Sequence, residues 1–135
     1  MIQGAQILAA DRRDLAQAMK RGFFGHCPRC GIGKIFRAYL KVDDACAVCR
    51  EALHHQRADD APPYITMLIV AHLVVAGIVA AEEFMPSASI FWGAVAWMAI
   101  AAATSLVLLP RVKGALVGYQ WAMRMHGFGG GADLP

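Results

Sequence analysis

Two long apolar stretches constrain the fold of this chain more than any other feature. Residues 64–81 contain no Lys, Arg, Asp or Glu over 18 positions, and residues 88–109 contain none over 22 positions. As helices they would extend ~27 Å and ~33 Å, close to the ~30 Å hydrocarbon core of a bilayer. The six residues 82–87 join them, so the sequence predicts an antiparallel transmembrane hairpin. Two buried helices of a soluble core are the alternative, which such uninterrupted lengths disfavour.

The composition of the 135-residue chain agrees with a membrane protein. Hydrophobic residues make up 58% and charged residues 17%, against about 45–50% and about 25% in soluble domains. One small core cannot bury this surplus of apolar residues. Intrinsic disorder is thereby excluded, and a simple soluble enzyme is disfavoured. The net charge of +3 gives no case for nucleic-acid binding, so we expect membrane lipid as a partner and no nucleic acid.

The basic residues predict the orientation of the hairpin. Of the thirteen Lys and Arg residues, ten precede residue 64, three follow residue 109 and none lies between the two spans, where Glu82 and Glu83 occur instead. Basic residues favour the cytoplasmic side, so we expect both termini in the cytoplasm and residues 82–87 as a periplasmic loop. The first 25 residues lack the apolar core of a signal peptide, and the first span is expected to direct insertion.

The four cysteines form two C-x-x-C pairs separated by 15 residues, Cys27 with Cys30 and Cys46 with Cys49. This spacing is typical of a four-thiolate metal site, because each pair turns two sulfurs toward one ion ~2.3 Å away and two pairs complete a tetrahedron. We therefore predict a structural Zn²⁺ site on the reducing, cytoplasmic side, where disulfides are disfavoured. Iron in the same four sulfurs and redox-active thiols are the alternatives.

The cysteine pairs predict a zinc ribbon over residues 26–50. Gly31 and Gly33 give backbone freedom after the first pair, and residues 35–42 (IFRAYLKV) are typical of a strand. Asp43 and Asp44 then predict a turn toward the second pair. A segment of about 25 residues is too short to bury a core of its own, so we expect the metal to supply most of its stability.

Several motifs together resemble a known family. They are Cys27-Pro28-Arg29-Cys30-Gly31, Phe36-Arg37, Leu40-Lys41, the second C-x-x-C, His55-x-Arg57-Ala58-Asp59-Asp60, Pro63-Tyr64, His72, Leu109-Pro110-Arg111-Val112-Lys113-Gly114-Ala115 and Gln120-Trp121-Ala122. From about residue 21 to residue 127, the chain resembles the bacterial family called domain of unknown function 983. One departure is Arg50, which stands where the family commonly has Gly.

The resemblance implies a small protein of the bacterial inner membrane with a cysteine-rich cytoplasmic head and no established activity. Some members of the family are encoded beside genes for terminal oxidases and their assembly, which implies a role in building respiratory complexes. This implication is an association, because a fold alone carries no mechanism.

The juxtamembrane linker, residues 51–63, concentrates histidine and aspartate. His54, His55, Asp59 and Asp60 are competent metal ligands or proton carriers, and together with His72 they form a candidate second site. In the alternative interpretation, Asp59 or Asp60 caps the first span, with two prolines in its first turn, where a missing N–H costs nothing.

His72 is the one ionisable side chain within either predicted span. It lies ~12 Å past Tyr64 along a helix, near the middle of the bilayer. We expect it to face protein rather than lipid and to hydrogen-bond a neighbouring helix. Ligation of haem by a dimer is the alternative. Two pairs of small residues, Gly77 with Ala81 and Ala99 with Ala103, predict close helix packing.

The ends of the chain predict shorter elements. Residues 1–25 form an N-terminal cytoplasmic segment with a short helix that begins at Asp11. Residues 110–127 are amphipathic and predict a helix in the cytoplasmic interface, with Trp121 at the headgroup level. Residues 128–135 (FGGGADLP) predict a flexible tail. The expected fold is thus a zinc ribbon followed by a transmembrane hairpin and an interfacial amphipathic helix.

The sequence contains no nucleophile–base pair, phosphate loop or dinucleotide motif. We therefore expect a non-enzymatic adaptor or assembly factor whose ribbon binds a membrane-bound protein, with a second copy of the chain as a further candidate partner. The expected docking residues are Arg29, Lys34, Arg37 and Lys41, a positive strip that suits an acidic protein or anionic lipid. A metal- or haem-handling protein and a thiol redox protein are the alternatives.

Overall fold

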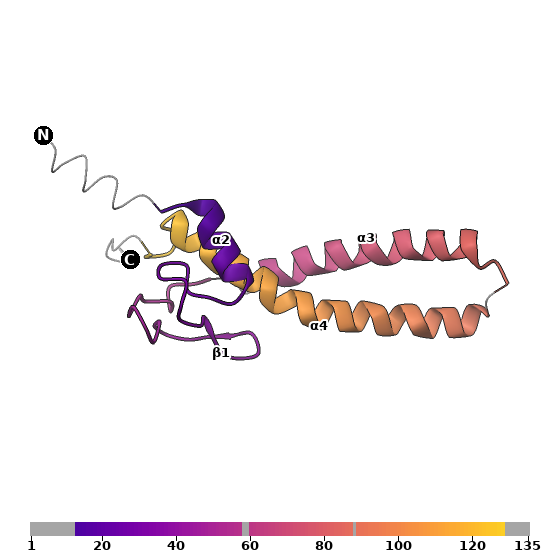
Figure 1. The fold of residues 1–135 in the computed structure, drawn as a ribbon, viewed down its shortest axis with the longest axis horizontal. Coiled ribbons are helices and arrows are strands. Elements are labelled where there is room, and N and C mark those ends of the chain that lie inside the picture. The colour runs from indigo at the N-terminus through magenta and orange to yellow at the C-terminus, as the bar shows by residue number, and fades with distance from the viewer. Residues whose placement is uncertain (1–12, 58–59, 88, 129–135) are drawn as a thin grey trace, which may run out of the picture.

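A small head is joined to a long helical hairpin in the computed structural model, which describes residues 13–57, 60–87 and 89–128 (Figure 1). The elements in chain order are α2 (Leu15–Phe23), β1 (Phe36–Ala38), β2 (Lys41–Val42), α3 (Ala61–Phe84) and α4 (Ile90–Ala122). Figure 1 shows α3 and α4 running side by side away from the head.

Helices α3 and α4, of 24 and 33 residues, are both long and apolar enough to cross a membrane. Most of their side chains away from the head are exposed, unlike those of a core helix in a soluble protein. Helix α3 begins three residues before the predicted span and ends three residues after it, so that Glu82 and Glu83 lie in its last turn. Pro62 lies in the first turn, followed by Pro63, as the sequence predicted.

Helix α4 continues through Pro110 without a break, so the predicted separate interfacial helix over residues 110–127 is not present. A proline inside a helix lacks the N–H that would bond the carbonyl four residues earlier. Here that carbonyl belongs to Leu106, and the hydroxyl of Tyr39 donates a hydrogen bond to it at 2.7 Å. A side chain from the head thus satisfies the carbonyl that the proline leaves free.

Helix α2 crosses the second half of α4 with its backbone in direct contact. A Cβ atom on Gly22 would collide with the carbonyl group of Gly114, and one on Gly118 would collide with the carbonyl group of Ala18. Both helices thus present two small residues four positions apart, a spacing that allows close backbone approach. Among the small residues that the sequence predicted for packing, Gly77 contacts the ring of Trp97.

The other predicted small-residue pair does not pack in this way, because Ala99 and Ala103 are exposed. The N-terminus of α2 also differs from the prediction. Its N-cap is Asp14, whose side chain accepts a hydrogen bond from the backbone N–H of Gln17 at 3.1 Å, while Asp11 lies outside the described residues.

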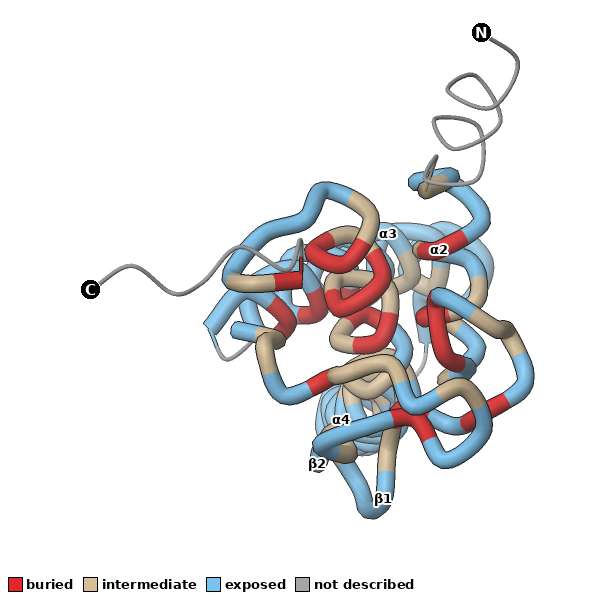
Figure 2. The backbone as a smooth tube through the Cα atoms, turned by 90° about the vertical axis from the view of Figure 1, so that its left-hand side faces the viewer, coloured by how far each residue is buried: buried red, intermediate tan, exposed pale blue. Residues whose placement is uncertain are grey.

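The core of the head forms around the second half of α4. Ile35, Leu53 and Val117 are fully buried together with Cys27 and Cys46, and Figure 2 shows buried segments gathered around α4 when the head is viewed along that helix. Residues from the cysteine loops therefore pack directly onto α4, which is both an arm of the hairpin and the central helix of the head.

Trp121 belongs to this core rather than to a headgroup layer. It is 8% exposed and packs with Ala18 and Phe128. Its indole N–H donates to a carboxylate oxygen of Glu51 at 3.0 Å, and the guanidinium of Arg13 lies 4.4 Å from the ring centroid. The expectation that Trp121 lies at a membrane interface is wrong, because the head covers this part of α4.

The segment predicted as one strand is a hairpin. Strands β1 and β2 pair antiparallel, with Phe36 opposite Val42 and Ala38 opposite Lys41. Leu40 adopts a positive φ of 58°, which reverses the chain between the strands. The ammonium group of Lys113 donates to the carbonyl oxygen of Leu40 at 2.8 Å, so α4 holds the hairpin tip on both sides of Pro110.

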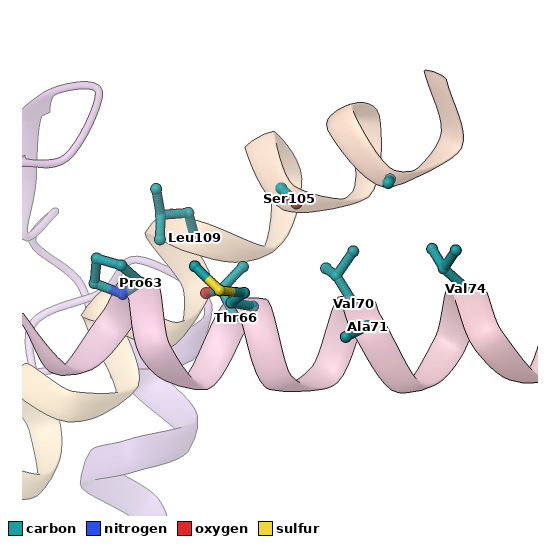
Figure 3. A pocket seen from close by; sticks show the side chains of 9 residues that line it. Pro63, Thr66, Val70, Ala71, Val74, Ser105 and Leu109 are labelled. Carbon is teal, nitrogen blue, oxygen red and sulfur yellow. The ribbon is translucent and has the colours of Figure 1, made fainter. Parts of the chain in front are cut away.

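A groove of about 400 Å³ lies between α3 and α4 near the head. Figure 3 shows Pro63, Thr66 and Val70 on one side of it and Ser105 and Leu109 on the other. Within the part of the chain that the structure describes, the buried hydroxyl of Thr66 has no hydrogen-bond partner. Apart from Thr66 and Ser105, the lining is apolar.

The crossing of α2 and α4 yields a stability prediction with a control in the same helix. Gly118→Ala places a methyl group against the carbonyl of Ala18, so we expect a loss of about 1–3 kcal/mol in the stability of the head. At Gly93 an added methyl group meets open space, so Gly93→Ala should leave the stability unchanged or raise it by up to ~1 kcal/mol. Thermal unfolding in detergent, followed by the reactivity of the head cysteines, measures both. Equal stability of the two variants would contradict the crossing.

Candidate metal centre

The four cysteine sulfurs converge on one point. All four Sγ atoms lie within 4.8 Å of one another. The Sγ atoms of Cys27 and Cys49 are 3.7 Å apart, and those of Cys30 and Cys46 are 3.8 Å apart. A tetrahedral ion with ~2.3 Å bonds to sulfur places its ligands ~3.8 Å apart. All four cysteines are free thiols, so the cluster can hold one metal ion.

Two similar turns aim the sulfurs. The backbone N–H of Gly31 donates to the carbonyl of Cys27 at 2.8 Å, and that of Arg50 donates to the carbonyl of Cys46 at 3.0 Å. The residue after each C-x-x-C pair has a positive φ, 72° at Gly31 and 61° at Arg50. Glycine adopts this conformation without cost, whereas Arg50 adopts it with strain. The turn is therefore the same after both cysteine pairs, although Arg50 stands where the family commonly has Gly.

Gly33 packs against the cluster itself. A Cβ atom at this position would collide with Sγ of Cys46, so any side chain here would push the second pair away. The backbone N–H of Gly33 also donates to Sγ of Cys30 at 3.5 Å. This hydrogen bond is the main reason why the pKa of the Cys30 thiol falls from 9.0 to about 6. The thiolate that a metal requires is thus favoured at Cys30.

Burial has the opposite effect on two other cysteines. It raises the pKa of the Cys27 thiol and, to a smaller extent, that of the Cys49 thiol. Buried thiolates without a counter-ion are unfavourable, and a bound cation is the partner that stabilises them. The cluster is therefore built for a cation, whose binding would release protons from these thiols.

Side chains outside the cluster fasten both turns to the helices. The guanidinium of Arg21 on α2 donates to the carbonyls of Pro28 and Arg29, at 3.1 Å and 3.0 Å. The side chain of Arg29 forms an ion pair with Glu51 at 3.0 Å, and Glu51 also accepts the Trp121 indole hydrogen bond from α4. Sequence reasoning missed the roles of Arg21 and Glu51, because both depend on contacts with segments distant in the chain.

Four thiolates in a tetrahedron suit zinc and iron alike. Both metals bind soft sulfur ligands in this geometry, so the donor set and the distances fit either ion. What the arrangement provides chemically is a closed site, since four protein ligands leave no position open for water or substrate. A closed site of this kind stabilises structure.

The candidate second site is not assembled in the same way. The rings of His54 and His55 stack with centroids 4.0 Å apart, and His55 also contacts the ring of Phe128 at 5.7 Å. Asp60 is the N-cap residue of α3 but makes no side-chain capping bond, and Asp59 lies outside the described residues. In the part of the chain that the structure describes, the four cysteines form the one group of three or more metal-ligating side chains.

His72 lies apart from these residues. It follows Asp60 by 12 positions, which is ~18 Å along α3. Its side chain is exposed, and its Nδ1 lies 2.7 Å from the carbonyl oxygen of Leu68, one turn earlier in the same helix. Within this chain, Nδ1 of His72 is thus bonded inside α3 and not to a neighbouring helix, so the expected bond to α4 is not formed.

The predicted docking residues are all exposed but lie in two places. Arg29 is next to the metal ligands and is paired with Glu51, and Lys34 follows the first cysteine pair. Arg37 and Lys41 lie on the β1–β2 hairpin, beside the middle of α4. The strip predicted from the sequence is therefore divided between the metal centre and the hairpin.

Comparison with known protein families gives one match. The family described as Protein of unknown function (DUF983) matches residues 36–121, well over half of the 135 residues. The matched segment contains the second cysteine pair, α3 and all but the last residue of α4, and it begins after Cys27 and Cys30. No curated protein and no solved structure matches the chain.

The geometry of the cluster predicts the effect of removing one ligand. Cys30→Ser should abolish stoichiometric metal binding and unfold residues 26–50, because the head depends on the ion. Helix α3 and the first half of α4, which lie outside the head, should keep their helical content. Metal analysis of the purified protein and circular dichroism measure the two effects. Val48→Ser, in the same turn as Cys46 and Cys49 but not a ligand, is the control and should keep the metal; equal metal content in wild type and Cys30→Ser would contradict the site.

Proposed function

The chain belongs to the family described as Protein of unknown function (DUF983), and we propose that it is a non-enzymatic zinc-ribbon adaptor of the bacterial inner membrane. Its head would bind a membrane-bound protein partner on the cytoplasmic side. The resemblance described above suggests a subunit or assembly factor of a respiratory complex, such as a terminal oxidase, as that partner.

Membrane insertion is supported by the two long apolar helices and by the distribution of charge. All thirteen Lys and Arg residues lie outside the two predicted spans and outside the loop that joins them. This bias supports a topology with both termini and the head in the cytoplasm. The short connection after Glu82 and Glu83 would then face the periplasm.

Zinc is the metal that best suits the proposed role. The four sulfurs offer a closed tetrahedral site, and two of them come from Cys27 and Cys46, which are fully buried in the core of the head. Zinc has no redox chemistry and commonly stabilises small segments of this kind. In this role the ion would hold the two cysteine turns together and leave the surface of the head to bind the partner.

The observation that carries the proposal is that α4 belongs to both parts of the molecule. Its first half is an arm of the apolar hairpin, and residues of its second half, among them Val117 and Trp121, lie in the core of the head. A head fixed in this way is confined to the membrane plane. Confinement raises its effective concentration near membrane-bound partners, which suits an adaptor.

Reporter fusions test the proposed topology. Fusions at Met1 and Pro135 should both report the cytoplasm, and a fusion within residues 85–87 should report the periplasm, because the basic residues stay on the cytoplasmic side. A dual reporter such as alkaline phosphatase with a fluorescent protein makes the measurement. A periplasmic signal at either terminus would rule out the hairpin topology.

Crosslinking from Lys34 tests the adaptor role. A photo-crosslinker at this exposed position should capture a respiratory-complex subunit in intact membranes. Lys34→Glu should reduce co-purification of that subunit at least several-fold, since it reverses the charge that an acidic partner recognises, without changing the metal content. Lys20→Glu, an equal charge change on α2, is the control.

One combination of results would contradict the adaptor proposal. If crosslinks from position 34 reach lipid alone, while His55→Ala by itself removes the cellular phenotype, the adaptor proposal is wrong. A metal-handling role for the histidine pair would then take its place.

A further inference from the structure

The β1–β2 hairpin lies at the boundary between the head and the apolar helices. Its tip contacts α4 at Leu106, whose carbonyl accepts the Tyr39 hydroxyl hydrogen bond. Leu106 is three residues inside the predicted end of the second span at Leu109, or ~4.5 Å along the helix. Figure 1 shows the hairpin, labelled at β1, beneath α4 with its tip turned toward the apolar helices.

Two hydrogen bonds fix this position on either side of Pro110. One joins Tyr39 to Leu106, and the other joins Lys113 to the carbonyl of Leu40. The tip therefore cannot swing away from α4 without leaving the Leu106 carbonyl unpaired. An unpaired carbonyl is costly within the hydrocarbon of a membrane, where no water can bond it.

The surface around the tip combines exposed aromatic rings with exposed cations. Tyr39 is 54% exposed, and its neighbours Arg37 and Lys41 are also exposed. On α4, the exposed Arg111 places its guanidinium 5.6 Å from the ring of Phe23. This combination is typical of the headgroup layer, where tyrosine anchors at the interface and basic residues attract anionic lipid.

A small hollow adjoins the hairpin at the same level. It has a volume of about 200 Å³ and is lined by Phe23, Phe24, Gly25, Phe36, Pro110 and Arg111. Phe36 belongs to β1, the strand that also carries Arg37, so the hollow borders this strand. The one cation in its lining is Arg111, surrounded by aromatic rings and backbone.

Among the described residues, no carboxylate forms an ion pair with the cations at this boundary. Over the described residues, the one ion pair between side chains joins Arg29 to Glu51, and Glu51 is tied to Trp121 at the other end of the head. Leu106 and Trp121 are 15 residues apart, or ~22 Å along α4. Arg29 at the far end of the head is thus paired, whereas Arg37, Lys41 and Arg111 form no ion pair within the described residues and are available to an external anion.

We propose that the β1–β2 hairpin is seated in the cytoplasmic headgroup layer and binds the phosphate of anionic phospholipids through Arg37, Lys41 and Arg111. This inference rests on the membrane placement proposed above. Tyr39 would lie at the boundary of the hydrocarbon, with the lipid phosphates around the three cations. The contact would hold the head at a fixed angle to the membrane.

Full-length protein in nanodiscs of defined lipid composition provides the test. Phosphatidylcholine nanodiscs are compared with nanodiscs that also contain phosphatidylglycerol. Hydrogen–deuterium exchange of the backbone amides at residues 37–41 should slow when the anionic lipid is present. Exchange at residues 46–51, at the metal centre, should be the same in both. Equal exchange at residues 37–41 in the two lipids would overturn the proposal.

Two variants supply an independent measurement. Arg37→Gln and Lys41→Gln should each lower the amount of phosphatidylglycerol retained in native mass spectrometry by about fivefold, the effect of ~1 kcal/mol per basic residue near an anionic surface. Arg50→Gln removes the same charge at the far end of the head and should retain wild-type binding. Metal content confirms that each variant is folded.

The outcomes separate the lipid proposal from the adaptor proposal. If Arg37→Gln and Lys41→Gln retain phosphatidylglycerol as well as Arg50→Gln does, the lipid site is wrong, even where the reporter fusions and the crosslinks from position 34 give their expected results. If the crosslinks fail while the two variants lose the lipid, the adaptor role is wrong and the lipid site stands.

Discussion

The structure depends on the passage of α4 through Pro110. A proline at this point removes one backbone hydrogen bond and can end a helix, and an end here would separate the head from the apolar hairpin. The Tyr39 hydroxyl takes over the Leu106 carbonyl, and the helix continues into the core of the head. The β1–β2 hairpin therefore does more than connect the two cysteine pairs, because its Tyr39 supplies the hydrogen bond that the Leu106 carbonyl of α4 would otherwise lack.

Once α4 enters the head, the other contacts follow from it. Backbone contacts at Gly114 and Gly118 bring α2 against α4, and Arg21 on α2 then holds the carbonyls of the first cysteine turn. Glu51, beside the second pair, is bonded to Trp121 on α4. The metal cluster is thus attached to the helices on both sides, which suits an ion that stabilises a head too small to bury a large core.

The parts that the sequence predicts are those with local causes. The two apolar helices follow from hydropathy within each segment, and the meeting of the four cysteines follows from the geometry of C-x-x-C turns. The continuation of α4 could not be predicted, because the partner of the Leu106 carbonyl lies 67 residues away along the chain. Trp121 was misplaced for a similar reason, since the head that buries it comes from residues far earlier in the sequence. The spacing of Gly114 and Gly118 was a visible signal for close packing, although nothing local identifies Gly22 as its partner.

The two ends of the head differ in how their charged side chains are paired. At the far end, Arg29 is paired with Glu51, which also receives the Trp121 hydrogen bond, while Arg50 beside the cluster is exposed. At the end beside the apolar helices, Arg37 and Lys41 are exposed, and the described residues supply no carboxylate partner for them. Self-repulsion among such cations is unfavourable unless an external anion is close, and a membrane surface supplies anions on one side only. Under the two proposals, the face around the β1–β2 hairpin would meet lipid, and the face at Lys34 would remain for a protein.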